Sequence, residues 1–403
     1  MTERQQTFFG WKVAWFAFAV AVFSWGVGFY GPSVFLHTLH ADRGWSISSI
    51  SAAITTHFLL SAAMVVYLPD AHRRFGLAWI TLTGVGFSVV GMLAWANSQY
   101  PWQLYVAALV SGAGWAATSG AAINAMVAPW FDRDRPRALS IAYNGASVGG
   151  AVFAPLWVAL IAQIGFVGAA AVISTVMAVM LAPLVFRFLS PVPRDLGSHP
   201  DGAVQEGAER PALKVTLSRR ELLRESRFLT ISGAFALGLF AQIGIFAHLI
   251  TRLAPILGES GAAWALSLTT VCAVIGRTLL GWLMGERDRR LAASLNFAFQ
   301  ASGVMLLVLG NGSAVLLLGC VLFGLGVGNL ISLPPLIAQK EFERGDVPTV
   351  VALVTAINQA VFAFAPAIFG AVRDLTGAYA VSFALAACMQ LAAIPIVLKG
   401  GRR

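Results

Sequence analysis

Long, unbroken apolar runs separated by short polar segments restrict the fold of this sequence more than any other feature. A membrane β-barrel would need alternating apolar and polar residues, whereas runs of about 20 apolar residues suit helices that cross a bilayer. Charged residues make up 11% of the 403 residues, against about 25% in a soluble domain. We therefore predict an all-α membrane protein.

Clusters of charged and turn residues divide the sequence into twelve predicted transmembrane helices. They cover residues 11–37, 46–69, 77–97, 101–128, 138–162, 166–188, 226–251, 260–284, 291–309, 313–338, 348–371 and 377–398. The first run is too long for the apolar part of a cleavable signal, so we expect it to remain as a helix.

One polar connection, residues 189–225, is much longer than the others and rich in Pro, Gly, Ser and charge. It predicts an N-terminal six-helix bundle (1–188), a cytoplasmic linker and a C-terminal six-helix bundle (226–403). Ser218–Phe228 at its end suits either a short amphipathic helix on the membrane surface or a flexible tether.

The two predicted bundles resemble each other in sequence. Phe153-Ala154-Pro155 in the fifth helix recurs as Phe364-Ala365-Pro366 in the eleventh, 211 residues later, and Phe131 matches Phe342 at the same offset. Internal repeats are typical of transporters, so we predict two pseudo-symmetric halves.

The basic residues are distributed unevenly between the two sides of the predicted membrane. With the N-terminus inside, 23 of the 27 Lys and Arg residues fall on the inner side, and the outer side holds Arg43, Arg252 and Arg373. This bias predicts a bacterial-type inner (plasma) membrane protein with both termini in the cytoplasm. It also accounts for the net charge of +9 without a nucleic-acid partner.

The sequence shows no cluster of residues suited to catalysis or metal binding. Cys272, Cys320 and Cys388 all lie within apolar runs and have neither metal-ligand spacing nor a disulfide pattern. A Walker motif is missing, which argues against ATP-driven pumping. We expect a monomer in contact with membrane lipids, with no enzymatic activity, cofactor or metal.

Several motifs carry a resemblance to a known family. They are Trp130-Phe131-x-x-x-Arg135-x-x-Ala138 continuing to Gly145-x-Ser147-x-Gly149, Gly10-Trp11-Lys12-Val13, Pro69-Asp70-x-x-Arg73-Arg74-Phe75-Gly76, and Gly281-x-x-x-Gly285-Glu286-Arg287. With these motifs the chain resembles the major facilitator superfamily, and within it the monocarboxylate transporter-like branch, which includes oxalate–formate exchangers. The resemblance implies a secondary transporter that works by alternating access.

The same resemblance implies an inner gate. Its expected residues are Asp70, Arg73, Arg74, Arg135 and Arg287. Alternatively, Arg73 and Arg74 serve only as topology signals, although the acidic Asp70 adds nothing to that bias.

Arg277 is the one basic residue deep inside a predicted helix. It lies about eight residues from the inner end of the eighth helix, roughly 12 Å into the membrane at 1.5 Å per residue. A buried arginine usually marks a substrate path, and its guanidinium matches a carboxylate with two parallel hydrogen bonds. In the resembling family an arginine at this place binds the substrate carboxylate. The alternative is a structural arginine that reaches toward the cytoplasm.

No Asp or Glu lies inside the twelve predicted helices. Relatives of the mammalian type carry an acid where this chain has Ala273 and a lysine near Tyr30, and oxalate exchangers carry a second cation on helix 11. A single fixed cation favours a monoanion as substrate. His57 and His248 are candidates for proton coupling, because histidine titrates near neutral pH.

Other polar or aromatic residues at helix depth suit either substrate contacts or contacts between helices. As substrate-binding candidates we include Tyr30, Trp115, Asn144, Gln242, Asn329 and Asn358 beside Arg277. The sequence predicts a carrier for a small organic monoanion such as a monocarboxylate, by proton symport or exchange. The alternative is an exporter of amphipathic drugs or siderophore-like metabolites.

Overall fold

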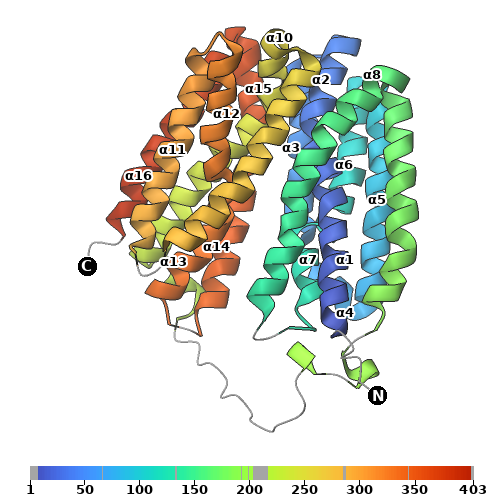
Figure 1. Cartoon of the computed structure of the whole chain (residues 1–403), viewed down its shortest axis with the longest axis vertical. Coiled ribbons are helices and arrows are strands. Elements are labelled where there is room, and N and C mark those ends of the chain that lie inside the picture. Colours follow the sequence, from blue (N-terminus) through green and yellow to red (C-terminus); the bar gives the residue numbers. More distant parts are fainter. Residues whose placement is uncertain are drawn as a thin grey trace, which may run out of the picture. The chain divides into compact units, whose positions relative to one another are not determined.

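The computed structural model describes residues 8–65, 67–131, 134–191, 193–197, 199–202, 217–284, 287–343 and 345–400. Every regular element in these residues is a helix. Ten helical stretches are long and apolar enough to cross a membrane. The two longest, in α8 (Arg135–Leu189) and α10 (Ser226–Met284), each double back near the middle and supply two spans, as Figure 1 shows. The twelve predicted spans are thereby accounted for.

Glycines make the two reversals possible. Gly165 and Gly258 have φ angles of 70° and 72°, a left-handed conformation that a side chain would strain. Without a reversal, the 53-residue apolar stretch in α8 would run for about 80 Å, far beyond a bilayer core of about 30 Å. Both glycines lie in the short connections that the sequence predicted between neighbouring helices.

The chain forms two compact units. Unit 1 contains residues 1–31 and 60–210, and unit 2 contains residues 32–59 and 211–403. The predicted N-terminal bundle, 1–188, therefore loses residues 32–59 to unit 2. These residues include nearly all of α2 (Gly31–Arg43) and the first part of α3 (Ile47–Val65).

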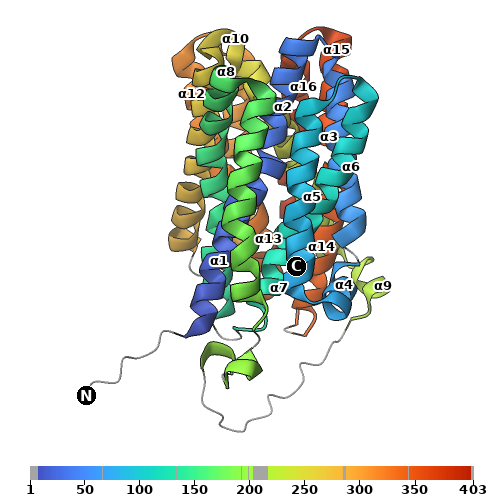
Figure 2. The same ribbon diagram turned by 90° about the vertical axis from the view of Figure 1, so that its right-hand side faces the viewer.

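Unit 1 is built from the remaining N-terminal helices. They are α1 (Phe9–Ser24), a π-helical turn η1 (Trp25–Phe29), α4 (Leu68–Phe75), α5 (Leu77–Asn97), α6 (Pro101–Thr118), α7 (Gly120–Val127), α8 and the 3-10 turns η2 (Pro193–Leu196) and η3 (Pro200–Gly202). The helices α5 and α6 lie side by side (Figure 2). Gly145 and Gly149 of α8 contact the backbone of α1, so the small residues of this motif allow two helices to approach closely.

Unit 2 contains the C-terminal helices. After α10 come α11 (Arg289–Leu309), α12 (Ser313–Val327), α13 (Asn329–Glu341), α14 (Val347–Phe362), α15 (Ala365–Thr376) and α16 (Tyr379–Lys399). Its apolar core includes the fully buried side chains of Phe228, Phe235 and Phe297. The helices α11 and α16 pack against each other (Figure 1).

The end of the linker is part of unit 2. Residues 203–216 lie outside the described residues, and the short helix α9 (Arg219–Leu222) follows. Ser218 and Glu221 cap it reciprocally, with hydrogen bonds of 2.7 and 3.3 Å. Leu222 is fully buried in the core of unit 2. The amphipathic surface helix considered for Ser218–Phe228 is thus a single capped turn before α10.

Candidate functional site

Arg277 lies in the second half of α10 and packs against the backbone at the point where α12 ends and α13 begins. Its Nε donates a hydrogen bond to the Gly328 carbonyl at 3.3 Å. A Cβ atom at position 328 would lie 2.6 Å from the Ala273 carbonyl of α10, 3.0 Å from Arg277 Nε and 3.1 Å from Nη2. Gly276 also lets α10 touch the backbone of Leu325. Gly276 and Gly328 therefore allow the half-buried guanidinium to approach the junction of α12 and α13 closely.

The tenth predicted span, residues 313–338, is interrupted beside Arg277, since α12 ends at Val327 and α13 begins at Asn329. The Asn329 amide nitrogen donates to Asn296 Oδ1 at 2.8 Å and to the Leu325 carbonyl at 3.1 Å. Asn296 in turn donates to the Gly326 carbonyl at 3.2 Å. Within the described residues the Asn329 Oδ1 atom is buried without a hydrogen-bond partner. The interruption thus carries an available acceptor close to a cation.

A second row of amides crosses unit 2, and sequence reasoning found only one member of it, Gln242. Gln300 donates to Gln242 Oε1 at 3.3 Å, and Gln390 donates to Gln300 Oε1 at 2.6 Å. Gln390 also donates to the Gly238 carbonyl at 3.2 Å. All three side chains are buried. The placement of Gln242 indicates a contact between helices.

Asn358, on α14, is the remaining candidate in unit 2. It is 4% exposed, and its Oδ1 atom has no hydrogen-bond partner within the described part of the chain. A buried acceptor without a donor costs about 1–3 kcal/mol. Asn358 and Asn329 are therefore the two candidates whose acceptors a ligand donor would satisfy.

In unit 1 the candidates Tyr30 and Trp115 lie at an aromatic cluster around the π-helical turn. Trp115 packs edge-on against Trp25 at 4.9 Å between ring centroids and stacks on Phe29 at 6.2 Å. Tyr30 is buried and meets Phe29 edge-on at 4.9 Å. A π-turn inside an α-helix is rare and is frequent at functional sites.

Two hydroxyl groups near this cluster donate hydrogen bonds to backbone carbonyls that flank an interrupted span. The fourth predicted span, residues 101–128, is interrupted at Ser119, between α6 and α7. Ser24 Oγ donates to the Thr118 carbonyl at 3.0 Å, and Tyr143 Oη donates to the Gly120 carbonyl at 2.8 Å. The half-buried Asn144 follows Tyr143 on α8.

The two histidine candidates belong to unit 2 and differ in surroundings. His57, on α3, is buried and packs edge-on against Phe58 at 5.0 Å. His248 is fully buried, and its Nε2 lies 3.1 Å from the Pro366 carbonyl and 3.5 Å from Ser51 Oγ. Its Nδ1 lies 3.4 Å from Tyr379 Oη. His248 therefore joins three helices.

The predicted gating residues make mostly local contacts. Asp70 and Arg73 form an ion pair within α4, and both side chains are largely exposed. The Arg74 guanidinium lies 5.2 Å from the Phe75 ring centroid. Gly285 and Glu286 of the corresponding motif lie outside the described residues.

The other two gating candidates contact their own unit. Arg135 donates to Asn124 Oδ1 at 3.0 Å in unit 1, and Arg287 donates to the Leu283 carbonyl at 2.7 Å in unit 2. No group of three His, Cys, Asp or Glu residues that suits a metal ion occurs among the described residues.

The fold matches a solved transporter structure. The nucleoside transporter NupG superimposes with a TM-score of 0.74 over 98% of this chain and 99% of its own, at 10% sequence identity. Twelve spans in this arrangement define a multi-pass helical membrane protein. The Major Facilitator Superfamily model matches residues 14–366. The chain belongs to the major facilitator superfamily, and it is a transporter, not an enzyme.

Two similar proteins carry the name of the branch that the sequence motifs indicated, and a third is named only by the superfamily. Monocarboxylate transporter 13 of Rattus norvegicus is 25% identical over 81% of this chain and 73% of its own. Monocarboxylate transporter 12 of Mus musculus is 25% identical over 69% of this chain and 62% of its own. The MFS-type transporter hasB of Aspergillus fumigatus is 27% identical over 57% and 52%.

Proposed function

We propose that this protein is a secondary carrier for a small organic monoanion such as a monocarboxylate, with Arg277 as its anion-binding residue. The observation that carries the proposal is the Arg277 guanidinium, held in the membrane against the Gly328 backbone. An arginine at this depth costs several kcal/mol unless it serves a cavity or a ligand. The names of the monocarboxylate transporters 12 and 13 support the same substrate class.

The acceptors near helix interruptions and on α14 support a substrate that also donates a hydrogen bond. Asn329 Oδ1 and Asn358 Oδ1 are buried acceptors without donors among the described residues. A hydroxyl group or a protonated acid would satisfy one of them. Proton symport with His248 or His57 as relay, and exchange without a relay, both remain compatible with this proposal.

The distribution of basic residues supports a membrane orientation. We infer an inner (plasma) membrane protein whose N-terminus and C-terminus both lie in the cytoplasm. In this orientation Lys12, Arg287 and Lys399 face the cytoplasm, and Gly165 and Gly258 lie at the outer surface.

Uptake into proteoliposomes tests the function. We expect Arg277→Ala and Arg277→Lys to abolish the uptake of small monocarboxylates, because neither variant keeps two parallel donors. Both variants should elute as monodisperse protein on size exclusion. Uptake at the wild-type rate in folded Arg277→Ala protein would contradict the proposal.

A second function, export of amphipathic compounds, is favoured by one observation, the cluster of Trp25, Phe29 and Trp115 in unit 1. The same Arg277 variants separate the two functions. An exporter of neutral or cationic amphipathic compounds would keep its activity in Arg277→Ala, whereas a carrier of monocarboxylates would lose it.

A further inference from the structure

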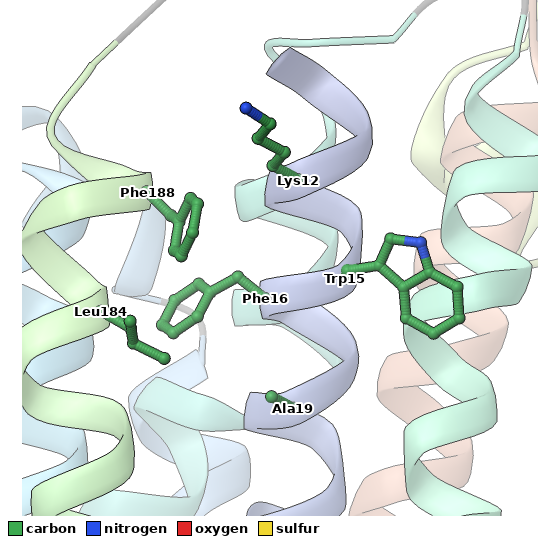
Figure 3. Close-up of a pocket in the computed structure, with 6 residues that line it drawn as sticks. All are labelled: Lys12, Trp15, Phe16, Ala19, Leu184 and Phe188. Carbon is green, nitrogen blue, oxygen red and sulfur yellow. The ribbon is translucent and has the colours of Figure 1, made fainter. Parts of the chain in front are cut away.

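An apolar groove lies on the surface of unit 1 between the beginning of α1 and the end of α8 (Figure 3). Its volume is about 330 Å³, and it is lined by Lys12, Trp15, Phe16, Ala19, Leu184 and Phe188. Figure 3 shows Phe16, Leu184 and Phe188 facing one another across the space between the two helices, with the Lys12 side chain near the end of α1. Lys12 is thus the one charged lining residue.

Stacked rings form the wall of the groove. Phe16 stacks on Phe188 at 5.5 Å between centroids, and Phe9 lies 6.1 Å from Phe188. Trp15 is 58% exposed, as is common for tryptophan at a membrane interface. From Lys12 to Ala19 the groove extends about 10 Å along α1, which is less than the thickness of one leaflet. A single acyl chain from the adjacent leaflet suits this depth.

Two basic residues, Lys12 and Arg187, lie at the groove, and the helices that form it contain no acidic residue to pair with them. Neither α1 nor α8 contains an Asp or Glu residue. Lys12 Nζ lies 5.9 Å from the Phe9 ring, and the Arg187 guanidinium lies 6.0 Å from the Phe188 ring. No ion pair of either cation occurs within the described residues. The chain therefore offers positive charge at the polar end of an apolar groove.

In unit 2 the basic residues at the corresponding position form ion pairs. By the predicted repeat, the start of α10 and the end of α16 correspond to the two helices of the groove. There Arg227 pairs with Glu225 at 2.9 Å, and the buried Arg290 pairs with Glu341 at 2.6 Å and donates to the Val397 carbonyl. Phe228 is fully buried. Within the part of the chain that the structure describes, the cations at this position of unit 2 are thus ion-paired, whereas Lys12 and Arg187 of unit 1 are not.

We propose that this groove binds one anionic glycerophospholipid, with an acyl chain between Phe16 and Leu184 and the headgroup phosphate beside Lys12 and Arg187. Charge complementarity selects an anionic headgroup over a zwitterionic one, since one basic residue near a membrane surface contributes about 1 kcal/mol. In the inferred orientation the groove opens to the cytoplasmic leaflet, where anionic lipids concentrate. The site does not involve Arg277 and does not depend on the transported substrate.

Native mass spectrometry of the purified protein tests the proposal, with phosphatidylglycerol and phosphatidylcholine titrated in parallel. The wild type should retain phosphatidylglycerol in preference to phosphatidylcholine. Lys12→Gln should weaken phosphatidylglycerol binding about fivefold and leave phosphatidylcholine unchanged. Ala19→Phe, which fills the groove without altering charge, should weaken both lipids.

Lys399→Gln is the matched control, because it removes an exposed cation from the last turn of α16 in unit 2. It should bind both lipids like the wild type. The proposal is overturned if Lys12→Gln and Lys399→Gln weaken binding equally, or if Ala19→Phe retains full binding. A second copy of this chain on the groove, seen as a dimer that Ala19→Phe dissociates without lipid loss, would also overturn it.

Discussion

The two units solve the same structural problem with different chemistry. The fourth span, in unit 1, is interrupted at Ser119 between α6 and α7, and the tenth span, in unit 2, is interrupted at Gly328 between α12 and α13. The separation of these two positions in the sequence differs by only two residues from the 211-residue offset of the repeat. In unit 1 the carbonyls beside the interruption accept from the hydroxyls of Ser24 and Tyr143, next to a cluster of aromatic rings. In unit 2 they accept from the Asn296 amide and the Arg277 guanidinium.

The comparison indicates that the two halves of this duplicated fold share the positions of their backbone interruptions but differ in the side chains that donate hydrogen bonds there. Interrupted helices in a membrane need donors for their carbonyl groups, and any donor of suitable reach is sufficient. Because unit 2 uses charged and amide donors, it holds the polar chemistry from which we infer anion binding. Unit 1 has a cluster of aromatic rings at the corresponding place.

Trp115→Ala is the variant expected to have the largest effect. Trp115 is 7% exposed and contacts two aromatic rings, so its removal should lower the free energy of unfolding by about 3–5 kcal/mol. Thermal unfolding in detergent measures it, with the 63% exposed Trp102→Ala as control. Loss of monocarboxylate uptake at unchanged stability would instead assign substrate binding to the aromatic unit.

Gln390→Leu tests the amide row of unit 2. The change leaves Gln300 Oε1 and the Gly238 carbonyl without their donor, at a cost of about 1–3 kcal/mol of unfolding free energy. The same unfolding assay measures it, and Ser302→Ala, an exposed hydroxyl on α11, is the control. The KM for uptake should stay at the wild-type value, and a raised KM would show that the amides reach the substrate.

Gly328→Ala sharpens the role of Arg277 without removing its charge. The added Cβ would lie 2.6 Å from the Ala273 carbonyl and 3.0–3.1 Å from the guanidinium, so both the α10 backbone and the Arg277 side chain must move away from position 328. We expect about a tenfold rise in KM, equivalent to about 1.4 kcal/mol. Gly233→Ala is the matched control, because its Cβ would meet only Ile396 at 3.9 Å. Equal kinetics in the two variants would refute the positioning role of Gly328.

The smallest expected effect is a dependence of stability on pH in unit 1. Burial lowers the pKa of His72, on α4 outside the spans, below the ordinary value of 6.5. The unfolded chain therefore binds a proton more readily, and the free energy of unfolding falls as pH drops below about 6.5. Melting temperatures at pH 7.5 and 5.5 should differ less in His72→Gln than in the wild type or in His199→Gln. An unchanged difference would exclude His72 as a cause.

The sequence predicted the spans well because each depends on composition over about 20 residues. It also predicted the reversals at Gly165 and Gly258, since each occupies a short connection. It did not predict the interruptions at Trp25–Phe29, Ser119 and Gly328. An apolar run continues unchanged through a π-turn or a break, because the hydrogen-bond register leaves no trace in composition.

The site residues named from the sequence stay predictions, and they include only some of the buried polar side chains that the structure connects in unit 2. Arg277 was recognisable because a charge within an apolar run is rare, whereas Asn296, Gln300 and Gln390 were missed. Asn296 and Gln300 lie four residues apart and therefore on one face of α11, a signal that was available. Which partner this face meets depends on packing between helices distant in sequence, and no local pattern encodes it.

The π-turn Trp25–Phe29 also determines in which directions the side chains of α2 point relative to those of α1. Each residue of an α-helix advances the side-chain direction by about 100°, so one residue accommodated in a wider turn rotates all later side chains relative to the earlier ones. The boundary between units 1 and 2 falls directly after this turn, at Gly31 and Pro32. Closing the turn to a regular α-helix without removing a residue would rotate the faces of residues 32–43 by about 100°. Deleting one residue within the turn would restore a regular helix and keep these faces directed at their neighbours in unit 2.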